Sequence, residues 1–135
     1  MTQHSGTFGP ELIDRIGAAR EVEIETQRPS GGRRRTIVWI VTDGTEVYVR
    51  SVRGSAGRWY RDLVANPAGA LHLGSDRIDV RVMPAADPAS VALVSDLFRT
   101  KYARSRASME SMLQAHTLET TLRLERSGVP ERADA

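Results

Sequence analysis

The sequence predicts an α+β protein: a six-stranded, mainly antiparallel β-barrel with three to four flanking helices. Six stretches have the apolar patterning of strands, and each neighbouring pair is joined by a turn or a short helix, which favours antiparallel pairing. In a chain of 135 residues, closing so many strands into a barrel removes exposed sheet edges. We expect a single domain over residues 1–135.

The N-terminal part predicts one helix and one strand. Residues 1–20 contain Gly-Pro followed by ELIDRIGAA, which indicates a short helix with proline in its first turn. Residues 21–26, EVEIET, alternate between apolar and acidic side chains and predict a half-buried strand. The side chains expected to face solvent on that strand are Glu21, Glu23 and Glu25.

The middle of the chain predicts a hairpin followed by a helix. Residues 36–42, TIVWIVT, are apolar on both faces, as in a strand buried on two sides. Asp43-Gly44 is a strong turn signal, and residues 46–52 form the returning strand. Residues 58–65 then place apolar side chains on one helical face, and Asn66-Pro67 ends that helix.

The rest of the chain supplies the remaining strands and helices. A second hairpin is expected from 70–73 and 77–83, so that the barrel strands occupy 21–83 and 117–125. Asp87-Pro88 begins the helical region at 88–115, with Asp as N-cap and Pro at the first position. The segment TLETTLRLE alternates as a final strand, and the tail at 127–135 is polar.

Positive charge is concentrated in one segment. The net charge is only +2 although the pI is about 9.5, because 18 of the 19 basic residues are Arg and few side chains titrate just above neutral pH. Residues 28–61 carry a formal charge of +6, and the other residues carry −4. This distribution favours a local anion site over a nucleic-acid surface. A GC-rich genome would also produce an Arg bias.

Composition excludes several other classes. The chain has no cysteine, which excludes disulfides, thiolate nucleophiles and Cys-based zinc sites, and this fits a cytoplasmic protein. No apolar run is long enough for a membrane span, and no secretory signal is visible. The three histidines lack the spacing of metal ligands, so no metal site is expected.

The Arg-Gly-Ser-Ala-Gly loop, residues 53–57, before the helix predicted at 58–65 is the best candidate for a phosphate site. Arg53 and Arg58 offer guanidinium donors, and the Ser55 hydroxyl offers another. Gly54 and Gly57 would allow close approach of the backbone. The helix that begins near Arg58 would direct its free N–H groups at an anion.

Three motifs occur in a fixed order around this loop: Arg35-Thr-Ile-Val-Trp39, Gly57-Arg58-Trp59 and Leu63-Val-Ala-Asn-Pro67. In this order they resemble the flavin-binding split β-barrel superfamily, which includes pyridoxamine-phosphate oxidase relatives and deazaflavin-dependent nitroreductase-like proteins. Trp59-Tyr60 with the Leu-x-x-Asn-Pro ending is similar to the deazaflavin branch. The resemblance covers roughly residues 21–83 and points to an uncharacterised subfamily.

The resemblance implies a flavoprotein or deazaflavin protein. Its cofactor would be FMN or a deazaflavin coenzyme of the F-420 type, held in a cleft at a homodimer interface. The implied activity is that of an oxidoreductase that transfers a hydride to or from a small organic substrate. Since the hydride chemistry belongs to the cofactor, no catalytic side chain is obligatory, and the catalytic residues are unknown. The implied cofactor-binding residues are Arg35, Thr36, Ile37, Arg53, Gly54, Ser55, Gly57, Arg58 and Trp59, of which Arg35 and Arg58 are the best phosphate contacts.

Two departures from the family pattern keep an alternative open. Trp59 replaces the oxidase lysine and Gly57 replaces its serine. The lysine of the deazaflavin relatives falls near Ser55, which carries no charge. The alternative is a non-redox small-molecule-binding protein or enzyme on the same fold that has lost its flavin. Trp59 is itself expected more often in the core than against a ligand ring.

Overall fold

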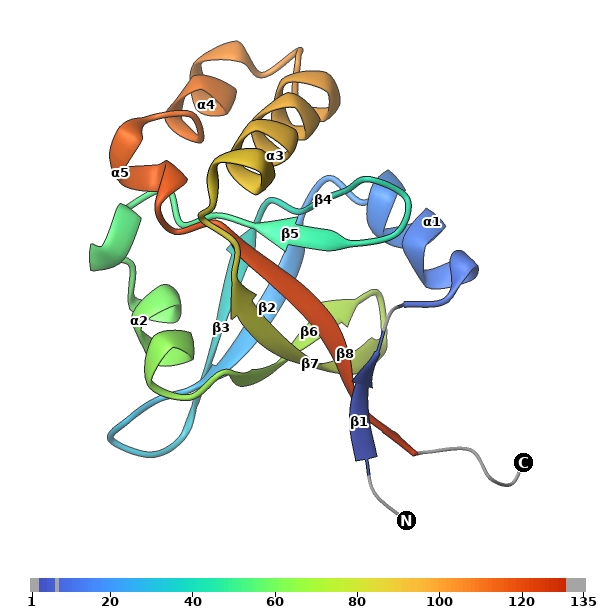
Figure 1. Cartoon of the computed structure of the whole chain (residues 1–135). Coiled ribbons are helices and arrows are strands. Elements are labelled where there is room, and N and C mark those ends of the chain that lie inside the picture. Colours follow the sequence, from blue (N-terminus) through green and yellow to red (C-terminus); the bar gives the residue numbers. More distant parts are fainter. Residues whose placement is uncertain (1–2, 7, 131–135) are drawn as a thin grey trace.

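The computed structural model describes residues 3–6 and 8–130. Figure 1 shows a curled sheet with α3, α4 and α5 gathered at one end and α2 beside β2 and β3. A 3₁₀ turn, Gly54–Ala56, precedes α2. The helices are α1 (Pro10–Ala18), α2 (Arg58–Ala65), α3 (Pro88–Lys101), α4 (Arg106–Ser111) and α5 (Ala115–Leu118). The strands are β1 (Gln3–Gly6), β2 (Val22–Gln27), β3 (Arg33–Val38), β4 (Val41–Thr42), β5 (Val47–Val49), β6 (Ala68–Leu73), β7 (Asp76–Pro84) and β8 (Leu122–Pro130).

The sheet is antiparallel throughout the described residues, in the order β3-β2-β6-β7-β8-β5-β4, with β1 added to β8. Its two ends, β3 and β4, are separated in the chain only by Trp39 and Ile40. One bent stretch of chain therefore forms both edges, and the sheet curls into a barrel. The predicted α+β fold with an antiparallel barrel is confirmed, although the described residues form eight strands and five helices where six strands and three to four helices were expected.

The bend between β3 and β4 corrects the prediction of one continuous strand at residues 36–42. At Ile40 the backbone bonds to side chains from the end of α3 instead of to another strand. Its N–H donates to the Tyr102 hydroxyl at 3.2 Å, and its carbonyl accepts from Lys101 Nζ at 2.6 Å. The Trp39 ring stacks on the Tyr102 ring with centroids 3.8 Å apart. The sequence of the strand contains no sign of these partners, because they lie about sixty positions away.

The last predicted strand, residues 117–125, is also corrected. Thr117 and Leu118 lie in α5, a turn follows, and β8 begins at Leu122. The alternation of Leu and Thr suggested a strand, but the threonine hydroxyls bond to nearby carbonyls. Thr120 Oγ1 donates to Thr117 O at 2.6 Å, and Thr121 Oγ1 donates to Leu118 O at 2.7 Å. Such local bonds stabilise turns at the expense of strands.

The ends of the chain differ from the prediction as well. β8 continues to Pro130, beyond the predicted start of the tail at 127, and β1 pairs with it antiparallel. β1 was not predicted; it precedes α1, which lies inside the helix expected within 1–20. Residues 131–135 of the predicted tail lie outside the described residues. The helical region at 88–115 divides into α3, α4 and the start of α5.

Two local signals give the structures they predict. Asp43 Oδ1 accepts from the N–H groups of Thr45 and Glu46 at 2.9 and 2.8 Å, and Gly44 has a φ of +98° in the hairpin turn. Asp87 caps α3, accepting from Ser90 N at 3.1 Å. In both cases the side chain satisfies backbone donors within three residues, so distant parts of the chain do not decide the outcome.

Apolar side chains form two clusters. The larger fills the barrel and includes Ile16, Ile24, Ile40, Leu63, Leu71 and Val80. The smaller packs α3 and the end of α4 against β4 and β5, and includes Val41, Tyr48, Val94, Phe98, Tyr102 and Met112. Each such fully buried side chain stabilises the fold by roughly 1.5–3 kcal/mol. The second cluster also holds in place α4, which forms one wall of the candidate site.

Glu25 corrects the expectation that the acidic face of β2 is open to solvent. Its side chain is 7% exposed. β2 lies between β3 and β6, which supply Arg33 and His72: Arg33 Nη1 donates to Oε2, and His72 Nε2 lies 2.7 Å from Oε1. Arg77 reaches over from β7, one strand further along the sheet, and its Nη2 also donates to Oε2. The hydrogen bond from Arg77, with those from His72 and Arg33, outweighs the cost of burial and lowers the pKa of Glu25 to about 2.

This cluster predicts a specific acid sensitivity. Because the folded-state pKa of Glu25 lies below its ordinary value of 4.5, its stabilising effect is full above pH 4.5 and is lost as the pH falls toward 2. Glu25→Gln should lower the free energy of unfolding at pH 7 by about 3 kcal/mol. The further decrease in this free energy at low pH should then be smaller than in the wild-type chain. Urea unfolding at a series of pH values measures both effects.

The control is Glu23→Gln on the same strand, which removes an exposed ion pair with Arg35. Glu23→Gln should lower the free energy of unfolding by less than about 1 kcal/mol, and stability should still fall with decreasing pH as in the wild-type chain. If the wild-type chain and Glu25→Gln lost stability equally as the pH falls below 4.5, the role given to Glu25 would be contradicted.

Candidate functional site

A cleft of about 300 Å³ opens between the β3–β4 bend, the end of β5, α2 and α4. Its walls are mostly apolar, with a few polar groups, which is the usual make-up of a small-molecule site. Ile37 and Val52 lie at its exposed edge, 60% and 47% accessible. The residues that line it are Glu21, Ile37, Val38, Trp39, Arg50, Val52, Trp59, Ser108, Ser111 and Met112.

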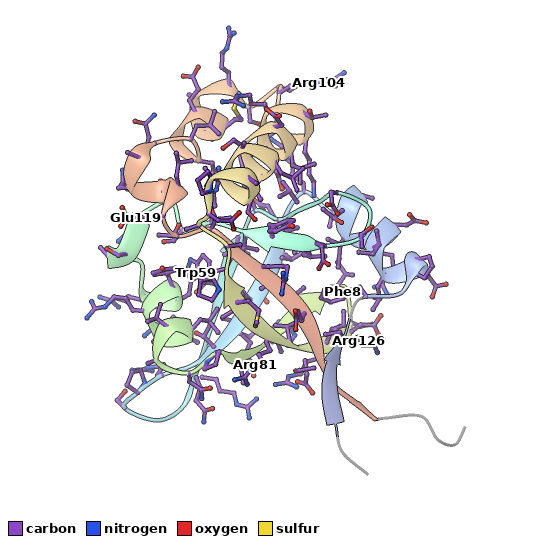
Figure 2. The ribbon with its side chains drawn as sticks, in the orientation of Figure 1. Phe8, Trp59, Arg81, Arg104, Glu119 and Arg126 are labelled. Carbon is purple, nitrogen blue, oxygen red and sulfur yellow. The ribbon has the colours of Figure 1, made fainter. Side chains whose placement is uncertain are left out.

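Both tryptophans of the chain line this cleft. Trp39 is fixed by its stacking on Tyr102, with an angle of 3° between the rings, and by the Arg20 guanidinium 5.7 Å from its ring centroid. Trp59 is buried on the side of α2 that faces the sheet (Figure 2). Two indole rings held in place provide flat surfaces for an aromatic ligand. Trp59 thus serves the core and the cleft at once.

The polar group at the base of the cleft is Arg50, which directly follows β5 and is 1% exposed. Its hydrogen bonds go to neutral oxygens of α3, of the α4 C-terminus and of the turn before β8. Within the described part of the chain, no carboxylate forms an ion pair with it. Burial, and then repulsion from Arg99, lower the pKa of Arg50 to about 10.

Sequence reasoning missed Arg50 and Trp39. Arg50 appeared as one of eight arginines in a basic segment, and nothing in EVYVRSV separates a buried guanidinium from an exposed one. Trp39 appeared as an apolar residue of a continuous strand. Only the bend after β3 turns its ring toward the cleft.

The glycine loop is folded on itself. Gly54 N donates to Ser51 O at 2.9 Å, and Gly57 N donates to Gly54 O at 3.1 Å. A Cβ on Gly57 would lie 2.3 Å from Ser51 Oγ, and one on Gly54, whose φ is +64°, would lie 2.8 Å from His116 O. These glycines therefore permit close packing against the protein's own chain. The first turn of α2 has no side-chain cap, so its N–H groups are still available.

The predicted cations lie in different places within one chain. Arg35 pairs with Glu23 and lines a hollow of about 280 Å³ that adjoins the cleft across Glu21 and Ile37. Arg58 lines another hollow, of about 340 Å³, together with Arg34 and Arg61.

Of the other predicted residues, Ile37 and Trp59 line the cleft, and Thr36 is half-buried on β3 beside it. Arg53 and Ser55 are exposed on the loop and line none of these three spaces. A single chain therefore brings part of the predicted set together and leaves Arg35 and Arg58 apart.

α2 is anchored by a buried carboxylate. Asp62 accepts from Thr26 Oγ1 of β2 at 2.8 Å and from Arg34 Nε of β3 at 2.9 Å. Charge-assisted bonds of this kind fix the helix against the sheet and hold Trp59 in the cleft wall. In the described residues no group of three or more His, Cys, Asp or Glu side chains is placed to hold a metal ion. None of the helices there is both long and apolar enough to cross a membrane.

The sheet has the split β-barrel fold, which several solved structures share. A conserved hypothetical protein, Rv2991, from Mycobacterium tuberculosis is similar with a TM-score of 0.60 and 14% identity, covering 100% of this chain and 98% of its own. HutZ, the heme storage protein from Vibrio cholerae, is similar with a TM-score of 0.60 and 14% identity, and the match covers 92% of this chain and 90% of HutZ. An F420 reductase is similar with a TM-score of 0.54 and 20% identity, and the match covers 90% of this chain and 95% of the reductase.

Residues 12–124 match the bacterial family described as "Uncharacterized protein conserved in bacteria (DUF2255)", and the chain belongs to that family. No curated protein matches the sequence. At these identities the solved structures establish the fold and leave the ligand to be argued from the cleft.

The tight loop beside the cleft gives a test of its geometry. Gly57→Ala should lower the free energy of unfolding by about 2 kcal/mol, because the new methyl group cannot share space with Ser51 Oγ. Gly9→Ala is the matched control, since a Cβ there meets nothing within 4 Å. Chemical denaturation compares the two; equal stabilities would contradict the packing described for the loop.

Proposed function

We propose that this protein is an oxidoreductase that binds FMN or a deazaflavin coenzyme of the F-420 type and transfers a hydride to or from a small organic substrate. The observation that carries the proposal is the cleft itself, which is walled by both tryptophans and bounded by β3. One solved structure with the same fold is an F420 reductase, and another is a heme storage protein, so the fold alone leaves the cofactor open.

The residues of the cleft fit the ring of such a cofactor. Ile37 lies where the cleft meets the adjoining hollow, so a flat ring there would contact apolar side chains on one side and reach Trp39 or Trp59 on the other. Arg35 in the adjoining hollow supplies charge for a phosphate. When bound, the cofactor supplies the hydride chemistry, and the protein contributes binding, orientation and exclusion of water.

A homodimer could bring Arg35 of one copy and Arg58 of the other to the same site, although they line separate hollows within one chain. If the cofactor site lies between two copies, β3 of one copy and the loop of Arg53 and Arg58 of the other can contribute to one site. The exposed side chains of Ile37 and Val52 at the cleft edge support such a contact, because apolar side chains at this exposure are better covered. A cytoplasmic location stays a prediction from composition.

The second candidate function is non-redox binding of a small molecule on the same fold. The observation that favours it is that Arg53, Ser55 and Arg58 do not line the cleft. A protein of this kind would be colourless when purified and would bind neither flavin nor deazaflavin.

The cofactor proposal is tested by spectroscopy. Freshly purified protein should show a flavin or deazaflavin absorption band, or should bind one of them with micromolar affinity. Quenching of tryptophan fluorescence is the signal, because both tryptophans line the cleft. Hemin is titrated in parallel. Failure of FMN and the deazaflavin to bind would overturn the proposal, and binding of hemin alone would replace it.

Arginine variants test where the phosphate binds. Arg35→Ala and Arg58→Ala should each weaken FMN binding about tenfold, the effect of losing one charge-assisted hydrogen bond. Arg104→Ala, an exposed arginine between α3 and α4, is the control and should leave affinity unchanged. Riboflavin, which lacks the phosphate, should bind all four proteins alike. Loss of FMN and riboflavin binding together would point to damage of the cleft.

The dimer is tested by sedimentation. Ile37→Glu should convert a dimer to a monomer, since it places a charge at the apolar edge of the cleft. Leu93→Glu on α3, also an exposed apolar site, is the control and should remain dimeric. A wild-type protein that sediments as a monomer at micromolar concentration would exclude the shared site.

A further inference from the structure

Arg50 is a buried positive charge, and no carboxylate of residues 3–6 and 8–130 forms an ion pair with it. Its Nε donates to Thr121 Oγ1 at 2.8 Å, its Nη1 donates to Ser95 Oγ at 3.1 Å and Met112 O at 3.0 Å, and its Nη2 donates to Val91 O at 3.0 Å. A guanidinium has five N–H groups. These bonds use four of them, so one N–H on Nη2 is left for another acceptor.

The four bonds explain why the side chain is long and rich in donors, but they do not explain why it is charged. Neutral oxygens satisfy hydrogen bonds without neutralising the ion, and a buried ion without a counter-charge is costly. Glu21 lines the same cleft but is exposed and makes no ion pair with Arg50. The face of the Phe98 ring, with its centroid 5.5 Å from the guanidinium carbon, offsets part of the cost of burying the charge. Among the described residues no carboxylate neutralises it, and it lies against the space that a ligand would fill.

The surroundings of Arg50 limit the kind of ligand. The cleft of about 300 Å³ holds a small ring system, and Trp39 and Trp59 line it. Ser108 and Ser111 of α4 add hydroxyl groups to the same lining. One open N–H and a single positive charge suit a monoanion with a planar oxygen group, which is a carboxylate.

We propose that the cleft binds a flat aromatic carboxylate whose carboxylate group lies at Arg50. This inference rests on the proposed function only in taking the same cleft as the ligand site, and it names the substrate class: a planar organic acid held by its charge at the inner end, with the cofactor at the edge formed by Ile37. Arg50 acts there as a binding residue and supplies specificity for an acid over its neutral analogues.

The test uses a matched pair of probes, 2-naphthoate and 2-naphthamide, which share a ring and differ in charge. Tryptophan fluorescence titration of the wild-type protein at pH 7.5 should give about tenfold tighter binding of the carboxylate. A crystal structure with 2-naphthoate should place a carboxylate oxygen within about 3.5 Å of Arg50 Nη2. Equal affinities for the two probes, or a carboxylate placed elsewhere, would overturn the proposal.

Variants separate the charge from the packing. Arg50→Gln should reduce the preference for the carboxylate to less than about twofold, and Arg50→Lys should retain part of it. Arg99→Gln removes an exposed charge that acts on Arg50 from outside the cleft, and it should leave the preference unchanged. A full preference in Arg50→Gln would contradict the assignment. If that variant does not fold, the wild-type affinities and the crystal structure decide.

The same preparations are titrated with FMN and the deazaflavin, so the two proposals can fail separately. Binding of a cofactor with no preference between the naphthyl probes would overturn only the carboxylate site. A preference for naphthoate without cofactor binding would overturn only the oxidoreductase and would leave Arg50 as the anion site of a non-redox binding protein.

Discussion

The bend at Trp39 and Ile40 is the constraint on which the barrel and the cleft both depend. It lets one stretch of chain pair with β2 through β3 and with β5 through β4, and so joins the two ends of the sheet. The bend is held by Tyr102 and Lys101 at the end of α3, which satisfy the N–H and carbonyl of Ile40. Without those partners the bend would bury an N–H and a carbonyl that have no hydrogen-bond partner, and this would lower the stability of the fold.

Arg50 connects the barrel to the helical end of the molecule. Through neutral acceptors it joins the end of β5 to α3, to the C-terminus of α4 and to the turn before β8. The same arrangement leaves its charge at the base of the cleft. Structural and binding roles therefore coincide in one side chain, and Trp59, which belongs to the core and lines the cleft, is a second example.

Local chemistry explains which parts of the fold the sequence could predict. The Asp43-Gly44 hairpin and the Asp87 cap depend on contacts within a few residues, and both are confirmed. Alternation failed at residues 117–121, where threonine hydroxyls bond to nearby carbonyls, and at Glu25, where side chains from β3, β6 and β7 surround the carboxylate. In the first failure the competing partners lay within three residues, inside the predicted strand, and apolar alternation does not register hydroxyl-to-carbonyl bonds; in the second, His72 and Arg77 lie about fifty positions away.

The sequence by itself determined the fold class, the order of most elements and the family resemblance, because these depend on periodicity, turn residues and motif order. Tertiary structure decided the candidate site. It turned the glycine loop inward onto Ser51 and His116, placed Arg35 and Arg58 in separate hollows, and brought Trp39, Arg50 and Trp59 into one cleft. A charge becomes a binding group through its burial and its lack of a counter-ion, and both are properties of the packed molecule.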